Sequence, residues 1–414
     1  MGGGFPKGRA LSMRILFVST SSGSHGGGEI FLLFLGRALA ARGQRVALWA
    51  STHPRMDPLC EAFREFGDVL RSDYVNTYDR RLRGLWNWSA PGRAAEWLSA
   101  WREWKPDVIH LNKQNLEDGL DLLRLMDRTT LPTVCTIHLT QSPSQLGAVL
   151  GGLRDRIARR GIARYGGPFV VLNQSRADDL RTFARLRRPP VLIGNGVLVP
   201  EAHSLLRLRE EMRRSLGLAP HEKLIIGVGR FVPQKRPLIF LEEAIRIRAS
   251  VPASRFLWIG AAPAQSFAWV GGQTQLGGAP LQEAWNQRVA DSGMKGAIEI
   301  LGWQKEVTPY LAAADLYVHS AAYEGLPFSL LEAMAAGVPV AVNPELADDL
   351  NFLDAANSLR LDPGIDWRAL FQDENHLFAI GQTGRKLIER DYSVARMAES
   401  HERLYGAFFD GAAV

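Results

Sequence analysis

The beginning of the chain follows the order strand, loop, helix, strand, and this order strongly limits the fold. Residues 14–19 and 45–49 are apolar runs typical of parallel strands that are buried on both faces. Between them a loop of small residues leads into a helical pattern over residues 29–42, and Gly43 stands where a C-terminal helix cap is expected. Such a β-loop-α-β unit predicts a doubly wound α/β sheet.

The same alternation continues along the 414 residues in two successive series. That length allows two domains of about 100–200 residues each. We therefore expect an α/β fold of two Rossmann-like, doubly wound domains that face each other across a cleft, with a boundary near residues 196–205. Further strands are expected at residues 108–111, 133–138, 169–172, 191–193, 224–228, 255–259, 298–301, 316–319 and 338–342, separated by helices such as Pro237–Ser250.

The domain organisation is expected to have four parts. Residues 1–12 are rich in glycine and would form a flexible extension, followed by an N-terminal domain over residues 13–197 and a C-terminal domain over residues 198–390. Residues 391–414 would form a helix that packs back on the N-terminal domain. Residues 260–278, rich in Gly, Ala and Gln, would form a loop or an insertion.

The net charge of +6 is the sum of two halves with opposite charge. Residues 1–200 hold 28 Lys and Arg against 17 Asp and Glu, whereas residues 201–414 hold 21 against 26. This asymmetry suggests that the two domains meet different partners.

The cysteines and the hydropathy of the chain indicate a cytoplasmic protein. Cys60 and Cys135 are too few for a disulfide framework or a four-thiolate zinc site, and this usage fits a reducing compartment. No apolar run approaches the roughly 18–20 residues that span a bilayer. The N-terminus also lacks the apolar segment of a signal peptide.

Ligands of doubly wound sheets bind at the carboxyl ends of the strands, so the loops after the strands are the candidate sites. Gly26, Gly27 and Gly28 follow the first predicted strand, and glycine there lets backbone N–H groups approach an anion. The dinucleotide fingerprint G-x-G-x-x-G is not met, because Phe31 replaces its third glycine, and this disfavours NAD. A simple tight turn is the alternative for this loop.

A second loop carries two cations. Gly229 follows the predicted strand at residues 224–228, Arg230 comes next, and Lys235 lies five residues further on. A planar guanidinium and a compact ammonium together suit a diphosphate. A solvated basic loop is the alternative.

The third loop is the most specific and runs from Glu324 to Glu332. Pro327 fits the first turn of the helix that follows, which leaves the N–H groups around Phe328 and Ser329 free for an anion. One carboxylate could meet a sugar ring and the other a pair of hydroxyls deeper in the cleft. As the alternative, the two carboxylates have no shared role: Glu324 interacts with the dipole at the helix N-terminus, and Glu332 is an exposed glutamate on the helix.

The run from Tyr323 to Val340 resembles the E-x7-E segment of retaining GT-B glycosyltransferases of the family 4 type. The similarity covers most of the chain and implies the GT-B fold. It also implies a hexosyltransferase that moves a sugar from a nucleoside-diphosphate sugar to an acceptor hydroxyl, with retention, in bacterial glycan or glycolipid assembly. Further matching segments are, in chain order, Gly27-Gly28-Glu29, Thr136-Ile137-His138, Asn195-Gly196 and Gly229-Arg230 with Lys235.

The resemblance implies roles for individual residues. Arg230 and Lys235 would hold the donor diphosphate, Glu324 would contact the donor sugar, and His138 would lie near the reacting sugar. A hydrogen-bonded core histidine is the alternative for His138, and buried packing is the alternative for Trp303 as a wall of the nucleobase site. The other implied donor-binding residues are Gly27, Gly28, Asn195, Gly229, Leu326, Pro327, Phe328, Ser329 and Glu332, the last at the nucleotide ribose.

Three departures from the family pattern affect the expected base and sugar of the donor. Asn343-Pro344-Glu345 stands where the family has a Gly-Gly turn, and Gly260-Ala261-Ala262-Pro263 replaces a Gly-Asp-Gly-Pro-like turn. Gly194 replaces a frequent proline. The residues assigned to the diphosphate are unchanged.

The sequence does not predict a metal or another cofactor. No D-x-D sequence occurs, so the carboxylate pair that would hold a metal on the donor diphosphate is missing. Positive charge from Arg230, Lys235 and a helix dipole would instead stabilise the leaving nucleoside diphosphate.

The basic N-terminal domain is expected to face the acceptor, a sugar or a lipid-linked glycan. Residues 80–88 interleave Arg with Trp, and residues 154–164 are rich in Arg. Both compositions suit peripheral contact with an anionic membrane surface. Nucleic acid is not expected, because no recognition motif accompanies the charge, and a solvated basic helix is the alternative.

Two other functions share this architecture. One is a nucleotide-sugar epimerase or a glycan phosphorylase, and the other is a nucleotide-sugar-binding protein without catalysis. The presence of Glu324, Glu332, Arg230, Lys235 and His138 argues against the non-catalytic protein.

Overall fold

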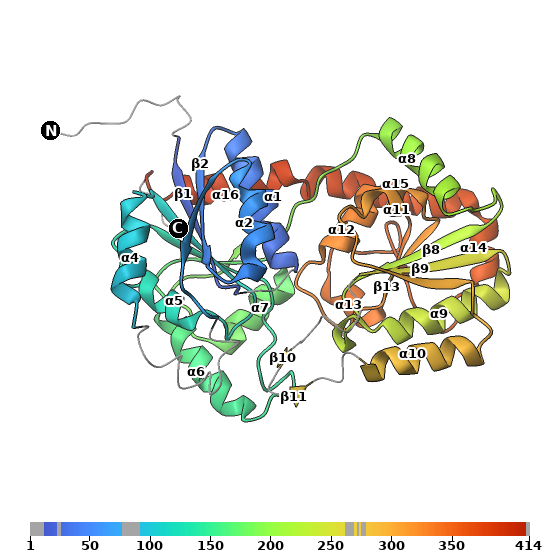
Figure 1. The fold of residues 1–414 in the computed structure, drawn as a ribbon, viewed down its shortest axis with the longest axis horizontal. Coiled ribbons are helices and arrows are strands. Elements are labelled where there is room, and N and C mark those ends of the chain that lie inside the picture. Colours follow the sequence, from blue (N-terminus) through green and yellow to red (C-terminus); the bar gives the residue numbers. More distant parts are fainter. Residues whose placement is uncertain are drawn as a thin grey trace.

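A computed structural model describes residues 12–22, 26–76, 92–260, 269–270, 273–274 and 279–410. Within these ranges the chain forms two α/β domains, each built on a parallel sheet with helices packed against it (Figure 1). The prediction of two Rossmann-like domains is confirmed. The expected extension at residues 1–12 lies, except for Ser12, outside the described residues.

The N-terminal domain contains a seven-stranded sheet in the order β3-β2-β1-β4-β5-β6-β7, with parallel pairing throughout. The strand order reverses between β1 and β4, which places a topological switch point beside the loops that follow these two strands. The strands are β1 (Arg14–Ser19), β2 (Arg45–Ser51), β3 (Asp68–Ser72), β4 (Val108–Lys113), β5 (Thr133–Ile137), β6 (Phe169–Val171) and β7 (Val191–Leu192). The α-helices are α1 (Gly27–Ala41), α2 (Asp57–Arg64), α4 (Ala94–Glu103), α5 (Leu120–Met126), α6 (Gly151–Arg164) and α7 (Gln174–Phe183).

The C-terminal domain repeats this topology in a six-stranded parallel sheet of order β12-β9-β8-β13-β14-β15. Its switch point lies between β8 and β13. The strands are β8 (Lys223–Val228), β9 (Ser254–Ile259), β12 (Ile298–Gly302), β13 (Leu316–His319), β14 (Val340–Val342) and β15 (Leu359–Arg360). The α-helices are α8 (Ala202–Ser215), α9 (Pro237–Ser250), α10 (Ala279–Asp291), α11 (Thr308–Ala313), α12 (Phe328–Ala335), α13 (Pro344–Asp349), α14 (Trp367–Gln372) and α15 (Glu374–Asp391).

Each apolar run that was predicted to be a strand contains one, and two edge strands were missed. β3 has mostly half-buried side chains, so it lacks a continuous apolar run, and β15 has two residues. β14 begins two residues later than expected, because Gly337 at φ +74° ends the preceding helix and Pro339 has no N–H for the ladder. Within residues 260–278, where a loop or an insertion was expected, the described residues include the antiparallel pair β10 (Trp269–Val270) and β11 (Gln273–Thr274).

The last helix, α16 (Val394–Gly406), lies beside α1 of the N-terminal domain (Figure 1). The chain crosses between the domains where Val197 and Ser393 form a parallel bridge. On α16, Glu402 pairs with Arg42 at 2.6 Å, and the Tyr405 hydroxyl lies 2.6 Å from His110 Nδ1. These contacts tie the end of the chain to the first domain.

The described helices include none that is long and apolar enough to cross a bilayer.

Candidate functional site

The two switch points meet at the interface between the domains. A side chain at Gly27, at the start of α1, would lie 3.4 Å from the ring of Phe328, at the start of α12. The Phe34 and Phe328 rings are also in edge-to-face contact, with centroids 5.6 Å apart. The glycine loop and the segment from Glu324 to Glu332 are therefore neighbours in the fold, although about 300 residues separate them in the sequence.

The N-terminus of α12 is open to an anion. Pro327 was expected in the first turn of the helix. It is instead the residue before the helix, with φ −75° and ψ 122°. The first intrahelical bond runs from the Leu331 N–H to the Pro327 carbonyl, over 3.2 Å. The N–H groups of Phe328 and Ser329 therefore have no acceptor within the helix, and the helix dipole favours negative charge there.

Two asparagines hold the loop that precedes α12. Asn195, in the linker between the domains, donates from Nδ2 to the Leu326 carbonyl over 2.7 Å. Asn173, in the N-terminal domain, donates to the Gly325 carbonyl over 2.7 Å. Gly325 itself lies so close to the N-terminal domain that a Cβ there would be 2.0 Å from the backbone oxygen of His138.

Lys235 and Glu324 form an ion pair at the switch point of the C-terminal domain. Lys235 ends a short turn whose backbone is fixed to the loop after β13, because the Ser320 hydroxyl donates to the Lys235 carbonyl over 2.8 Å. Gly229 leaves room for the lysine stem, since a Cβ there would be 3.1 Å from its Cγ and Cδ. Arg230 is exposed in the same loop. The structure therefore brings a lysine and a carboxylate together beside the start of α12.

His138 follows β5 in the N-terminal domain and is nearly buried. Its Nε2 lies 2.7 Å from Oδ1 of Asn112, whose Nδ2 donates to the Gly28 carbonyl over 3.0 Å. Since this amide already donates to Gly28, its oxygen faces the imidazole, and we assign the ring proton to Nε2. Burial lowers the pKa of His138 to about 4, so the ring is neutral at pH 7.

His319 is a site residue that the sequence analysis missed. It ends β13, is buried, and has Nδ1 2.9 Å from the Tyr317 hydroxyl, which also contacts the Ser329 hydroxyl at 3.0 Å. Its Nε2 lies 4.0 Å from Glu324 Oε1 and has no hydrogen-bond partner among the described residues. Burial lowers the pKa of His319, and the charge of the nearby Lys235 lowers it further, so this ring is also neutral at pH 7. A histidine at the end of the strand before Glu324 was the sequence signal that could have identified it.

Glu332 and Trp303 differ in their surroundings. Glu332 lies on α12, and burial raises its carboxyl pKa to about 7. Trp303 follows β12, and its side chain is 69% exposed. The alternative interpretation of Trp303 as a buried packing residue is therefore wrong.

The described residues contain no cluster of three or more His, Cys, Asp or Glu side chains that could hold a metal ion.

The structure corrects the interpretation of one basic segment. Arg154, expected on a basic surface, is instead buried on α6 and donates from Nε to Glu117 Oε1 over 2.6 Å. Arg156, Arg160 and Arg164 on the same helix are exposed. The other basic segment, residues 80–88, lies outside the described residues.

Both domains match known family models. Residues 25–199 match the model described as Glycosyltransferase Family 4, and residues 222–349 match the model described as Glycosyl transferases group 1. The two matches follow the two structural domains in order.

Curated relatives are similar over part of their length. The "UDP-Gal:alpha-D-GlcNAc-diphosphoundecaprenol alpha-1,3-galactosyltransferase" of Escherichia coli is 28% identical over 37% of this chain and 36% of its own length. The "Lipopolysaccharide core biosynthesis mannosyltransferase LpsB" of Rhizobium meliloti is 25% identical over 55% of this chain and 64% of its own. The chain thus spans less than two thirds of these relatives.

Solved structures are similar over the whole fold. HepE of Anabaena, in complex with UDP and glucose, has a TM-score of 0.72 at 16% identity and covers 95% of this chain and 100% of its own. Sucrose-phosphate synthase of Thermosynechococcus elongatus has a TM-score of 0.73 at 18% identity and covers 97% of this chain and 100% of its own. These likenesses show the two-domain GT-B fold.

Proposed function

We propose that this chain, whose two domains match glycosyltransferase family models, transfers a sugar from a nucleoside-diphosphate sugar to an acceptor hydroxyl, with retention and without a metal. The observation that carries the proposal is the pairing of Lys235 with Glu324 beside the open N-terminus of α12, facing the glycine loop of the other domain. The names of the relatives favour a role in bacterial polysaccharide or lipopolysaccharide assembly.

The diphosphate of the donor would bind between the two helix N-termini. Arg230 and Lys235 would contact its oxygens together with the N–H groups of Phe328 and Ser329, and the Gly27-Gly28 loop would approach from the N-terminal domain. These groups stabilise most strongly the charge that develops as the bond between the sugar and the diphosphate breaks. Leaving-group stabilisation and orientation would thus supply most of the rate.

The remaining site residues would orient the sugar and the nucleoside. Glu324, held by Lys235, would accept hydrogen bonds from sugar hydroxyls, and Glu332 would accept from the ribose. His138, neutral and fixed through Nε2, would present Nδ1 near the reacting sugar. Donor contacts are also proposed for Asn195, Gly229, Leu326, Pro327 and Trp303, the last against the base.

The acceptor would bind on the side of the N-terminal domain. A lipid-linked glycan fits the basic charge of that half, and the E. coli relative is named for a diphosphoundecaprenol substrate. We propose peripheral contact with an anionic membrane at the cytoplasmic face. The full chain would then co-sediment with anionic vesicles at low salt and not at high salt.

A donor screen tests the proposal. Thermal unfolding is measured with UDP-, GDP-, ADP- and dTDP-sugars, since a bound donor stabilises the folded state by mass action. We expect one nucleotide class to raise the midpoint in the wild type and not in Lys235→Ala. Release of free nucleoside diphosphate that requires an acceptor would support transfer. Interconversion of the donor without an acceptor would instead indicate an epimerase, and binding without turnover a non-catalytic protein.

A further inference from the structure

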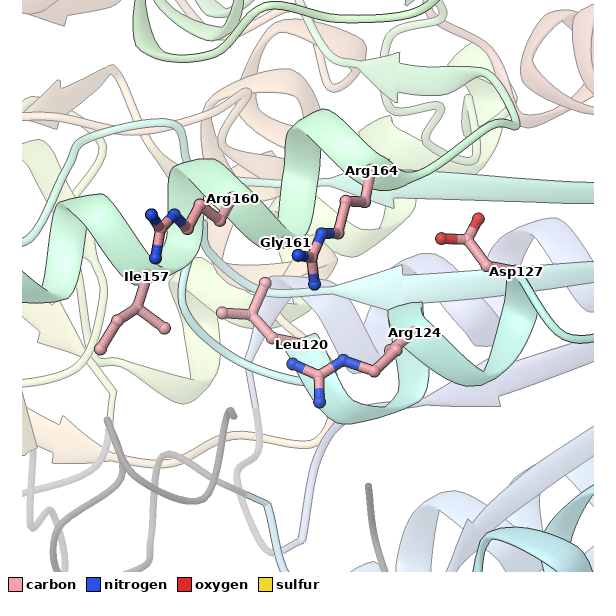
Figure 2. A pocket seen from close by; sticks show the side chains of 7 residues that line it. All are labelled: Leu120, Arg124, Asp127, Ile157, Arg160, Gly161 and Arg164. Atoms are coloured by element: carbon pink, nitrogen blue, oxygen red, sulfur yellow. The ribbon is translucent and has the colours of Figure 1, made fainter. Parts of the chain in front are cut away.

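A pocket lies between α5 and α6, on residues that the proposed transfer site does not use. It has a volume of about 360 Å³ and opens between the two helices (Figure 2). Gly161 allows this close packing, because a Cβ there would be 3.0 Å from the Leu120 side chain. The residues that line the pocket are Leu120, Arg124, Asp127, Ile157, Arg160, Gly161 and Arg164.

The charge of this pocket is strongly unbalanced. Three arginines line it with a single carboxylate, Asp127, whose Oδ1 accepts from the Gly166 N–H over 3.2 Å. Figure 2 shows Arg124 and Arg164 extending from the two helices toward the same space beside Leu120. Within the described part of the chain, Arg160 and Arg164 form no ion pair. The like charges of the arginines repel one another within the pocket, and a bound anion would reduce this repulsion.

The electrostatics of Arg124 agree with this picture. Burial lowers the pKa of the Arg124 guanidinium, and the charge of Arg164 lowers it further, whereas the carboxylate of Asp121 raises it. The positive charges of the two residues therefore repel each other across the pocket.

We propose that the α5–α6 pocket binds a phosphate-bearing anion, a phosphate monoester or a diphosphate, through Arg124, Arg160 and Arg164. Guanidinium groups match phosphate oxygens in bidentate geometry, and three of them around one space can neutralise a charge of two or more. The Leu120 and Ile157 side chains supply an apolar wall for an organic group attached to the phosphate. The phosphate could belong to a soluble ligand or to a lipid headgroup, and the experiment separates these sources.

The test uses the full chain with Arg230→Ala as background, so that phosphate binding at the proposed donor site is weakened in every sample. Calorimetric titration with sodium pyrophosphate and co-sedimentation with phosphatidylglycerol vesicles are compared for Arg160→Gln/Arg164→Gln and for the matched control Arg159→Gln. Arg159 lies on the same helix but stacks on Phe183 instead of lining the pocket. The charge-conserving pair Arg160→Lys/Arg164→Lys accompanies them as a conservative variant.

We expect Arg160→Gln/Arg164→Gln to weaken binding at least roughly tenfold, Arg159→Gln to change it less than about twofold, and the lysine pair to fall between them. Loss of pyrophosphate binding alone would indicate a soluble phosphate ligand, loss of vesicle binding alone a lipid headgroup, and loss of both a site that accepts either. Equal effects of the double variant and the Arg159 control, or no effect on either probe, would overturn the proposal. Donor-induced stabilisation, measured without the Arg230 change, should persist in the double variant, so failure of this site and failure of the proposed transferase remain distinguishable.

Discussion

His138 Nε2 lies 2.7 Å from Oδ1 of Asn112, and the same amide donates to the Gly28 carbonyl over 3.0 Å. One buried side chain thus fixes both the proposed catalytic imidazole and the glycine loop at the start of α1. The three residues come from β4, from the end of β5 and from α1, so the sheet itself sets their spacing.

Asn112→Ala should therefore lower kcat by roughly 10- to 100-fold while changing the KM of the donor little, because the imidazole loses its orientation. Asn112 would act as a positioning residue. Removing it also leaves buried polar groups unpaired, at a cost of about 1–3 kcal/mol in the free energy of unfolding. Asn357→Ala is the matched control: Asn357 is also buried and donates to the Phe352 carbonyl over 3.0 Å. If the control lost as much activity as Asn112→Ala, the positioning role would be wrong.

Lys235→Ala should lower kcat/KM by roughly 100- to 1,000-fold, the usual effect of deleting one preorganised stabiliser of developing negative charge. Donor binding should weaken as well, because Glu324 loses its partner. Lys386→Ala removes an exposed lysine from α15 and should leave the rate unchanged. Initial rates with saturating acceptor measure both effects, and wild-type activity in Lys235→Ala would refute the phosphate-site assignment.

Part of this site could be predicted from sequence because its signals are local. The strands around Ile15, Ile226 and Val318 are continuous apolar runs, and Pro327 marks the start of α12 within its own segment. Asn112 was not predicted, since its partners lie 84 and 26 residues away and become neighbours only through the sheet. The partner of Arg154 is likewise distant: Glu117, 37 residues earlier, takes this arginine from the expected basic surface into the interior.

Glu332→Gln should change how stability depends on pH. The pKa of Glu332 rises from 4.5 to about 7 on folding, so between these values the folded state holds a proton that the unfolded state has lost. Protonation of Glu332 therefore contributes fully to stability below pH 4.5, and this contribution falls as pH rises and is lost above pH 7. The total loss in the free energy of unfolding is at most about 3 kcal/mol.

Four buried histidines make stability rise with pH over part of this range, because burial lowers their pKa values. These are His110, His138, His319 and His401. The informative quantity is therefore the difference between wild type and variant in denaturant unfolding. Glu332→Gln should be more stable than the wild type at pH 8 and equal to it near pH 4.5. Glu283→Gln, an exposed change on α10, should show no pH-dependent difference. A constant difference for Glu332→Gln across the range would contradict the raised pKa.

Removal of divalent cations should leave transfer intact. The proposed site stabilises the diphosphate with Arg230, Lys235 and backbone N–H groups, so an excess of EDTA should change the initial rate by less than about twofold. Addition of Mg²⁺ or Mn²⁺ after EDTA treatment is the control for indirect effects of the chelator. A large loss of rate that either ion restores would show that a metal takes part.

Gly325→Ala should lower the transfer rate by at least roughly 100-fold and weaken donor binding less. A Cβ at residue 325 would stand 2.0 Å from the His138 backbone oxygen, and neither backbone can yield without moving one domain away from the other. A displacement of about 1 Å between reacting groups is enough to cost roughly 100-fold in rate. Gly364→Ala is the control, because a Cβ there meets nothing within 4 Å. Transfer rates and donor-induced thermal shifts on both variants separate the two properties, and normal transfer by Gly325→Ala would show that the contact between Gly325 and His138 is not needed for the reaction.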